Sequence, residues 1–385
     1  MPAWVLTDML SLARSSLIHE FHRYVPAGLA VSFASLLLLL QMALLLGLFR
    51  TVTAVVDQSG AHVWLTSPRL PSFDQAVDIP ARSRLVLQGR RDVTATEDVA
   101  MVNAAVRIPD GANLAATVIG YDLRPDAFAM PKSFRPELAE ALRLPGSVVI
   151  DEADAPKLGA QIGTVLEING HRAPVVGLTR HFRGVGGVYL FTSLASAREF
   201  NGRGLEVPAM TTFVAARVSD PARAQAVRDE IQPANGPRMY DAWTSEELSR
   251  HSQLYWLLET GMGVGILFSV LVGVVVGIVV TSQTLRSVIL NSMREFATLR
   301  ALGVPVAALR GIVLELAAWI GVLGLAGTAL TAVAAAAVAN RANVSLYFPW
   351  WTIVATILYT FVVTFVSGFV ALRTLYATEP AELLR

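Results

Sequence analysis

The sequence predicts a membrane protein with four transmembrane α-helices and a large extracytoplasmic α/β domain inserted between the first and second helices. Of its 385 residues, 54% are apolar and only 16% are charged. Four apolar runs reach the ~20 residues that a helix needs to cross a bilayer: Val25–Phe49, Gly261–Val280, Gly311–Ala339 and Pro349–Leu372. Roughly two hundred residues of mixed composition separate the first two runs, which is enough for one or two soluble modules.

The predicted segments follow one another in a simple order. An amphipathic interfacial helix at 1–24 precedes the first span at 25–49, and residues 50–250 form the α/β domain with its stalk helices. The remaining segments are the second span at 251–282, a cytoplasmic helix at 283–304, the third span at 305–339, a short outer loop at 340–348, the fourth span at 349–373 and a cytoplasmic tail at 374–385.

The distribution of arginine predicts the orientation. The link between the second and third spans carries four arginines and one acid, whereas the link between the third and fourth carries only Arg341. The positive-inside bias therefore makes the first of these links cytoplasmic, the α/β domain extracytoplasmic and both termini cytoplasmic. The alternative, that the first run is a cleaved signal peptide, is disfavoured because the run is too long and follows a 24-residue head.

The head has a helical pattern, with apolar residues three and four apart, such as Leu6, Leu10 and Leu17. This pattern predicts a helix lying in the cytoplasmic interface. His19 and His22 could bind a metal, but no other ligand type clusters with them, which favours a solvated polar face. The chain contains no cysteine, which excludes disulfides and thiolate metal sites. We therefore predict no metal site.

The segment from Thr51 to His251 is predicted to be mixed α and β. Asn169-Gly170 is a hairpin signal, because both residues tolerate the positive φ of a type I′ turn. Asp220 and Pro221 are placed to begin a helix that runs to Ile231. The predicted strands are Ala61–Thr66, Val99–Ile108, Leu114–Tyr121, Thr164–Ile168, Ala173–Leu178, Val188–Phe191 and Thr211–Val218. No phosphate loop, serine elbow or paired carboxylate motif occurs in this segment, so the sequence assigns no catalytic residue and leaves the substrate unknown.

A helix is predicted to lead from the domain into the second span. Thr244 and Glu247 fit a capping box, and neither proline nor glycine interrupts Ser245–Thr260. If this helix continued to Leu290, it would be roughly 65 to 70 Å long at ~1.5 Å per residue. The bilayer core needs only ~30 Å, so the remainder would form a rigid stalk. Arg50–Gln58 is a candidate matching extension of the first span.

Small residues recur every fourth position at the start of the second span. A stripe of this kind lets another helix backbone come close. The partner is either a neighbouring span of the same chain or a second copy in a dimer, and the pattern leaves both open. The stripe consists of Gly261, Gly265, Ser269, Gly273 and Gly277.

One acid, Glu315, lies within the third apolar run. A charge costs several kcal/mol at the bilayer centre and much less near the interface. Glu315 lies about one helical turn inside Arg310. We therefore favour interfacial pairing with Arg310 over a proton or substrate site.

The cytoplasmic link contains an amphipathic helix pattern. Ile289, Met293 and Phe296 form an apolar ridge, polar residues line another face, and Gly303 follows as a helix stop. A simple topological anchor would need the arginines but no patterned apolar residues. The pattern alone leaves both interpretations open.

A resemblance decides between them. REFATLRALG, Arg294–Gly303, closely resembles the cytoplasmic coupling motif of the MacB/FtsX superfamily of ABC transporter permeases, and its form is most similar to the DevC branch. The tail Glu379–Arg385 resembles the terminal motif of the family, and Leu158–Gly184 with Val188–Arg198 is similar to the DevC-type periplasmic segment. The order of one span, a large outer domain and three further spans agrees.

The resemblance implies a dimeric permease, homodimer or heterodimer, in the inner membrane with its large domain in the periplasm. Each half would be bound by a cytoplasmic ABC ATPase, which supplies ATP and Mg²⁺, and the spans would transmit its closure outward. A HlyD-type periplasmic adaptor and an outer-membrane duct are the other implied partners. No Walker A motif occurs in the chain, so it is not expected to be an enzyme by itself. The coupling residues implied are Met293, Arg294, Glu295, Phe296, Leu299, Arg300, Leu302 and Gly303.

Three other functions compete with export. An FtsX-like regulatory protein would use its outer domain to activate a cell-wall hydrolase. A lipoprotein-releasing permease of the LolC or LolE kind would be expected to lack the DevC-like segment. A receptor with an outer sensor domain is disfavoured, because the cytoplasmic parts are too short to contain a signalling domain.

Overall fold

The computed structural model describes residues 21–108, 111–182, 184, 187–202, 210–232, 239–291, 306–341, 344 and 346–377. The chain divides into two compact units. One combines Met1–Gly47 with Val264–Arg385 and holds the apolar helices; the other, Leu48–Gly263, is an α/β domain.

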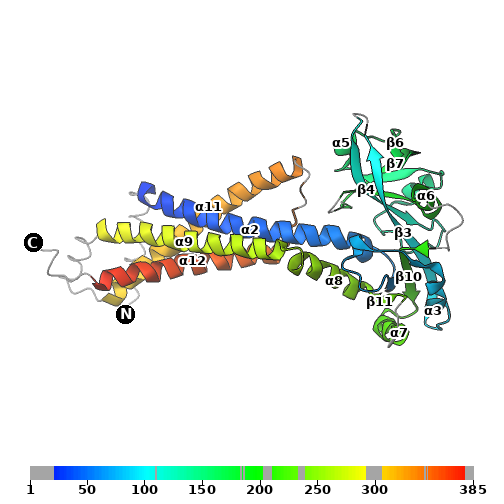
Figure 1. Ribbon diagram of the computed structural model, residues 1–385. Helices are drawn as coiled ribbons and strands as arrows, with labels where there is room; N and C mark the ends of the chain where they lie inside the picture. The colour runs from blue at the N-terminus through cyan, green and yellow to red at the C-terminus, as the bar shows by residue number, and fades with distance from the viewer. Residues whose placement is uncertain are drawn as a thin grey trace, which may run out of the picture. The chain divides into compact units, whose positions relative to one another are not determined.

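Among the described residues, four long helices contain stretches that are long and apolar enough to cross a membrane (Figure 1). They are α2 (Phe21–Asp57), α9 (Met262–Asn291), α11 (Val306–Arg341) and α12 (Trp350–Ala377). The candidate spans within them are Tyr24–Asp57, Met262–Gln283, Arg310–Arg341 and Trp350–Val370. The prediction of four apolar helices is confirmed.

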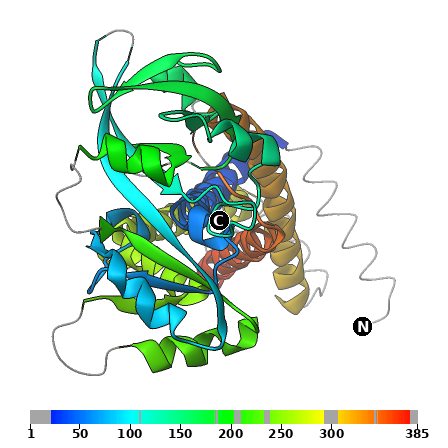
Figure 2. The same ribbon diagram turned by 90° about the vertical axis from the view of Figure 1, so that its right-hand side faces the viewer.

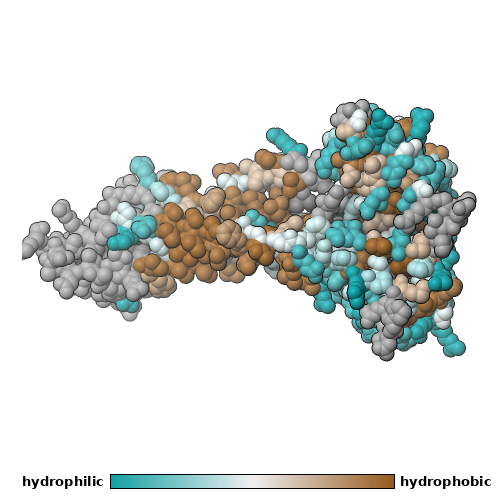
Figure 3. All heavy atoms as spheres, viewed as in Figure 1, coloured by the Kyte–Doolittle hydropathy of each residue, from teal (hydrophilic) through white to brown (hydrophobic). Residues whose placement is uncertain are grey.

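The helices expose apolar side chains, which Figure 3 shows in brown. On α9, for example, Leu267, Phe268 and Leu271 are all more than half exposed. Lipid tails are as apolar as these side chains, so exposure of this kind carries no cost in a bilayer. Association of the helices therefore depends on close packing and on hydrogen bonds between them.

Both kinds of contact are present in the helical unit. A Cβ added at Gly327 of α11 would lie 2.7 Å from the Ser32 hydroxyl oxygen of α2, a distance that real Cβ atoms do not reach. Ser35 of α2 and Thr360 of α12 share a 2.7 Å hydrogen bond. Glycine at the crossing thus brings α11 against α2, and the hydroxyl pair ties α12 to α2.

The α/β domain is built around one continuous set of nine strands in the order β11-β1-β10-β3-β4-β8-β5-β7-β6. An additional pairing of β3 with β6 closes the last six strands into a barrel. Strand β3 (Val93–Arg107) is the longest: its first half pairs with β10 in the open part of the sheet and its second half with β4 in the barrel. Figures 1 and 2 show β3 running from the one part to the other.

The other elements are short. The remaining strands are β1 (Val63–Thr66), β4 (Asn113–Tyr121), β5 (Val148–Asp151), β6 (Val165–Ile168), β7 (His171–Thr179), β8 (Val188–Ser193), β10 (Phe213–Val218) and β11 (Asp241–Thr244), with a separate pair β2 (Ile79–Pro80) and β9 (Met210–Thr211). The helices are α3 (Arg84–Gln88), α4 (Pro136–Ala141), α5 (Ala155–Leu158), α6 (Leu194–Phe200), α7 (Ala224–Ile231) and α8 (Ser245–Leu258). The described residues also form the 3-10 turns η1 (Phe73–Gln75), η2 (Ala81–Ser83) and η3 (Pro221–Arg223).

The largest apolar core joins the sheet to the ends of two helices. Trp64 of β1 is fully buried and makes edge-on contacts with Phe73 and Phe213. Val55 of α2 and Leu248 of α8 belong to the same cluster. Burial of a large apolar side chain contributes about 1.5 to 3 kcal/mol. This core therefore fastens α2 and α8 to the open sheet.

Local sequence signals predicted several turns and caps correctly. Asn169 and Gly170 both have positive φ, 46° and 84°, as a type I′ turn requires. The Asp220 side chain accepts a 3.0 Å hydrogen bond from the amide of Ala222 at the start of η3 and α7.

Other expectations need correction. Strands β5 and β11 lie outside the predicted strands, and β3 begins at Val93 instead of Val99. The helix from Ser245 does not continue to Leu290: α8 ends at Leu258 and α9 begins at Met262. The reason lies at Gly261, whose φ of 75° is left-handed and incompatible with a continuous right-handed helix.

Candidate functional site

The predicted coupling segment lies outside the described residues. Helix α9 ends at Asn291 and α11 begins at Val306. The coupling residues Met293, Arg294, Glu295, Phe296, Leu299, Arg300, Leu302 and Gly303 all fall between these two positions.

The structure divides the predicted small-residue stripe. Gly273 and Gly277 face α2: a Cβ at Gly277 would lie 2.9 Å from the Cβ of Ala34, and one at Gly273 would lie 3.4 Å from Leu37. A Cβ at Gly265 would meet nothing within 4 Å among the described residues. Ser269 is half-buried, and Gly261 precedes the helix. Of the stripe, only Gly273 and Gly277 are used in close helix packing within the described part of the chain.

Glu315 lies on α11 and is half-buried. Trp319, one turn further along the helix, donates a hydrogen bond to its carboxylate. Within the described ranges, the Oε1 atom of this carboxylate is buried and has no hydrogen-bond partner.

Ser245, the first residue of α8, is bonded to the segment that follows α2. Its amide donates to the carbonyl of His62 over 3.1 Å, and its hydroxyl donates to the carbonyl of Ala61 over 2.7 Å. The indole Nε1 of Trp64 donates to the same hydroxyl over 3.1 Å. We call this region, from the last turn of α2 through β1 to the first two turns of α8, the junction.

Asp57, the last residue of α2, connects the two helices of the junction directly. Its Oδ2 accepts a 2.6 Å hydrogen bond from Thr53, and its Oδ1 accepts a short one from Ser249 of α8. An ionised carboxylate accepting two hydroxyl hydrogen bonds makes contacts roughly twice as strong as neutral ones. The ends of α2 and α8 are therefore tied at one carboxylate.

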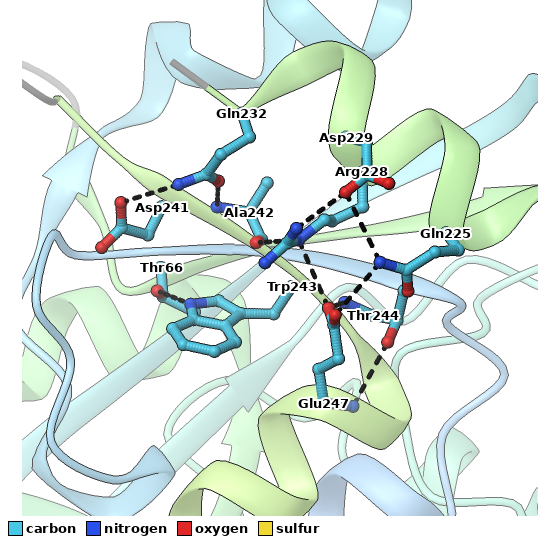
Figure 4. Close-up of polar contacts among 10 residues, drawn as sticks. All are labelled: Thr66, Gln225, Arg228, Asp229, Gln232, Asp241, Ala242, Trp243, Thr244 and Glu247. Atoms are coloured by element: carbon cyan, nitrogen blue, oxygen red, sulfur yellow. Dashed lines mark hydrogen bonds and ion pairs between the residues drawn. The ribbon is translucent and has the colours of Figure 1, made fainter. Parts of the chain in front are cut away.

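The start of α8 is also bonded to β11 and α7 (Figure 4). The Thr244 hydroxyl accepts from the amide of Glu247, and the Glu247 carboxylate accepts from the amide of Thr244, so the predicted capping box is present. Arg228 of α7 donates through Nε to the carbonyl of Ala242 over 3.1 Å and lies 3.3 Å from the Glu247 carboxylate. One guanidinium group thus links α7, β11 and α8.

Gln232, which follows α7, and Trp243 of β11 add further hydrogen bonds to this network. The Gln232 side chain donates to Asp241 over 3.2 Å and accepts from the amide of Ala242 over 2.7 Å. The Trp243 indole donates to the Thr66 hydroxyl over 3.1 Å (Figure 4). Strand β11, which pairs with β1 along its length, is therefore held from both sides. A displacement of α8 would strain the sheet edge as well as α2.

Two buried carboxylates lie where β3 passes from the open sheet into the barrel. Glu97 accepts hydrogen bonds from the amides of Phe128 and Ala129, and burial raises its pKa against their effect. Asp98 lies 3.3 Å from Arg84 and 3.6 Å from Arg198, and burial raises its pKa although both arginines lower it. Arg84 and Arg198 belong to α3 and α6, so Asp98 connects the helices flanking the two parts of the domain.

Sequence reasoning found the capping box and missed most of the junction. Thr244 and Glu247 are three residues apart, a spacing that can be recognised locally. Ser249 and Asp57 are separated by 192 positions, and neither lies in a motif. Among the described residues, no three His, Asp or Glu side chains form a group that could hold a metal ion.

Four apolar helices and a large α/β domain define a membrane protein with a substantial domain outside the bilayer. Residues 27–234 match the family model of the MacB-like periplasmic core domain, and residues 266–380 match the FtsX-like permease C-terminal model. The first match alone covers more than half of the chain. The chain belongs to the MacB/FtsX superfamily of ABC transporter permeases, an inner-membrane family with a periplasmic domain whose members work with ABC ATPases.

Solved structures with similarity cover about half of the chain. The extracellular domain of the noncanonic ABC-type transporter YknZ from Gram-positive bacteria is 11% identical, with a TM-score of 0.33, over 48% of this chain and 98% of that chain. The periplasmic region of MacB from Actinobacillus actinomycetemcomitans is 9% identical, with a TM-score of 0.34, over 51% of this chain and 94% of that chain. No curated protein matches the sequence.

Proposed function

We propose that this chain is the permease subunit of an ATP-driven ABC exporter that works by mechanotransmission. A separate cytoplasmic ATPase would hydrolyse ATP with Mg²⁺, and the apolar helices would carry its conformational change to the periplasmic domain. This role requires no catalytic residue in the chain. It requires a docking surface for the ATPase and a firm attachment between helices and domain.

The observation that carries the proposal is the junction. Helix α2 continues from its apolar stretch to Asp57, where it meets α8 through Ser249. Helix α8 is separated from the apolar helix α9 only by Glu259–Gly261. Helix α8 is also bonded to β1 through Trp64 and Ser245 and to β11 through Thr244 and Glu247, and α2 packs into the same apolar core through Val55. A change in their relative position would therefore act on the sheet.

The sequence motif supports the cytoplasmic half of the proposal. Glu295 and Phe296 lie in the segment that resembles the coupling motif of the family. In this proposal the apolar ridge inserts into a groove of the ATPase, and Arg294 and Arg300 pair with acids on its rim. Aromatic, methionine and arginine side chains, such as Met293, Phe296 and Arg300, are enriched at specific protein interfaces.

We further propose that two copies of the permease form a homodimer and that the periplasmic domain binds a HlyD-type adaptor connected to an outer-membrane duct. The DevC-like segments Leu158–Gly184 and Val188–Arg198 support this choice. An FtsX-like regulator would bind a cell-wall hydrolase instead, and a lipoprotein-releasing permease would bind acylated protein.

The test is co-purification of the full chain with the ATPases encoded beside its gene. Glu295→Ala combined with Phe296→Ala is expected to abolish the complex and the stimulated ATP hydrolysis. Glu137→Ala, at an exposed position on α4, serves as the matched control and should change neither. An unchanged complex in the double variant would remove the coupling assignment. The periplasmic partner that co-purifies, adaptor or hydrolase, distinguishes export from the regulatory alternative.

A further inference from the structure

A hollow of about 310 Å³ lies between the outer face of the barrel and the elements around α8. Its lining residues come from η1, α8, β3, β4 and β8. Asp74 is the only charged residue among them. This hollow is separate from the junction, and the proposed function makes no use of it.

The strand register explains the barrel wall of the hollow. Asn103 is paired with Thr117, and Thr117 is paired with Tyr189, so the three residues form a row across β3, β4 and β8. Residues two positions along a strand share a face, which places Ala115 beside this row, with Gly187 next to it immediately before β8. A polar row beside very small residues leaves a depression with hydrogen-bonding groups along one side.

The opposite wall is held by three hydrogen bonds between η1 and α8, one of them from the Phe73 amide to the Ser252 hydroxyl over 3.0 Å. The Trp256 indole donates to the Asp74 carboxylate over 3.2 Å, and the Tyr255 hydroxyl donates to the Gln75 side chain over 3.2 Å. Ser72 also donates to Asp74. Both of these bonds to Asp74 reach the same oxygen, Oδ1. In the described part of the chain, the carboxylate has no cationic partner.

Tyr189 contributes an unsatisfied hydroxyl to the same place. Its side chain is 2% exposed, and its hydroxyl has no hydrogen-bond partner among the described residues. Burial, followed by the negative charge of nearby Asp74, raises its pKa, so the phenol stays neutral. A buried polar group left without a partner costs about 1 to 3 kcal/mol. A ligand that hydrogen-bonds to Tyr189 would recover this cost.

We propose that this hollow is a binding site for a small primary amine whose ammonium group sits between Asp74 and Tyr189 and whose apolar body lies against Trp256 and Ala115. An ammonium group has three donors, which suits an anionic carboxylate and a phenol oxygen at once. An indole face attracts cations and covers apolar surface. The volume is at the lower end of the range for small-molecule sites, so the ligand is small.

The site lies close in sequence to the second candidate span. Trp256 belongs to α8, and the candidate span Met262–Gln283 begins six residues later. Six residues reach at most about 20 Å even when fully extended. A bound amine would therefore contact the helix that leads into the second span.

Tryptamine is a suitable probe, because it joins a primary ammonium group to an indole, and N-acetyltryptamine is its matched uncharged control. Binding to the full chain in lipid nanodiscs can be titrated by saturation-transfer NMR, with empty nanodiscs as the background. We expect saturable binding of tryptamine and binding at least about tenfold weaker for N-acetyltryptamine, since a hydrogen bond to a charged group contributes about 1.5 to 3 kcal/mol.

Two variants test the site itself. Asp74→Asn keeps an oxygen for Trp256 but removes the charge, and Ala115→Leu fills the hollow from an exposed position. Each should weaken tryptamine binding by about tenfold or more. Asp74→Asn does so because a charge-assisted contact is lost, and Ala115→Leu because the space for the ligand is lost. Glu137→Gln on α4 should bind as the unaltered chain does. Absence of saturable binding, equal binding of both probes, or unchanged binding by a folded Asp74→Asn variant would each overturn the proposal.

Discussion

Ser249 of α8 donates a hydrogen bond to Asp57, the last residue of α2, although 192 positions separate them in the chain. The bond joins the helix that contains the first apolar stretch to the helix that precedes the second. Both helices enter the same apolar core through Val55 and Leu248. A permease that transmits force needs a connection of this kind at its periplasmic side.

Asp57→Asn combined with Ser249→Ala should uncouple the two helices. Thr53 and Ser249 both donate to the Asp57 carboxylate, and the double change removes the charge and one of the donors. We expect normal assembly with the ATPase but loss of most of the ATP hydrolysis that depends on the periplasmic partner. Thr51→Ala, on the same last turns of α2, is the control. Full partner-dependent hydrolysis in the double variant would contradict a coupling role for this bond.

Thr244→Ala should loosen the start of α8. Loss of a capping hydroxyl costs about 1 kcal/mol. The Thr244 amide, which alanine keeps, still donates to the Glu247 carboxylate, so the variant removes only the bond from the Glu247 amide to the hydroxyl. Hydrogen exchange at the Glu247 amide should become faster by about fivefold, as 1 kcal/mol implies. Ser193→Ala removes the equivalent cap of α6, whose hydroxyl accepts from Ser196, and should leave α8 protected. Equal protection of Glu247 in both variants would show that the box contributes nothing.

Gly277→Val and Gly265→Val compare two members of the small-residue stripe. Valine at 277 would clash with Ala34 and crowd Val363, whereas valine at 265 meets open space among the described residues. Overpacking costs about 1 to 3 kcal/mol, so Gly277→Val should lower the melting temperature and Gly265→Val should not. Size-exclusion chromatography with light scattering on the same variants measures whether the protein is a dimer. If Gly265→Val makes it monomeric, Gly265 contacts the second copy of the chain.

Asp98→Asn should change how stability depends on pH. Burial raises the pKa of Asp98 in the folded chain, so between the unfolded and folded pKa values the folded state binds more protons. The free energy of unfolding therefore falls as pH rises through this window, and asparagine removes that dependence. The melting temperature of Asp98→Asn relative to the unaltered chain should rise from pH 4 to pH 8. Asp126→Asn, at an exposed position, is the control, and an offset that does not vary with pH would refute the argument.

Short-range signals in the sequence predicted much of the fold. The four apolar stretches, the Asn169-Gly170 turn and the Thr244–Glu247 cap depend on composition or on neighbours within four residues. Strand β11 was missed because Asp241–Thr244 is a strand only through its pairing with β1. The first half of β3 is rich in polar residues and is held extended by β10.

Gly261 has a backbone role that the stripe did not indicate, for a related reason. Its position four residues before Gly265 made it part of a packing stripe, but its left-handed backbone ends the run of helix between α8 and α9. A glycine that packs and a glycine that turns look identical in sequence. The contacts of Asp57 and Tyr189 depend on register between distant segments, so no local pattern could have predicted them.

Strand β3 has a thermodynamic consequence for the periplasmic domain. Its fifteen residues supply hydrogen-bond partners to β10 at one end and to β4 and β6 at the other. If the barrel unfolds, the second half of β3 loses its partners β4 and β6, and if the open sheet unfolds, the first half loses its partner β10. Unfolding of either part therefore exposes backbone of the strand that both parts share. The two parts are therefore expected to unfold in a single cooperative transition, and a partner that pulls on the barrel also loads the sheet edge that holds α8.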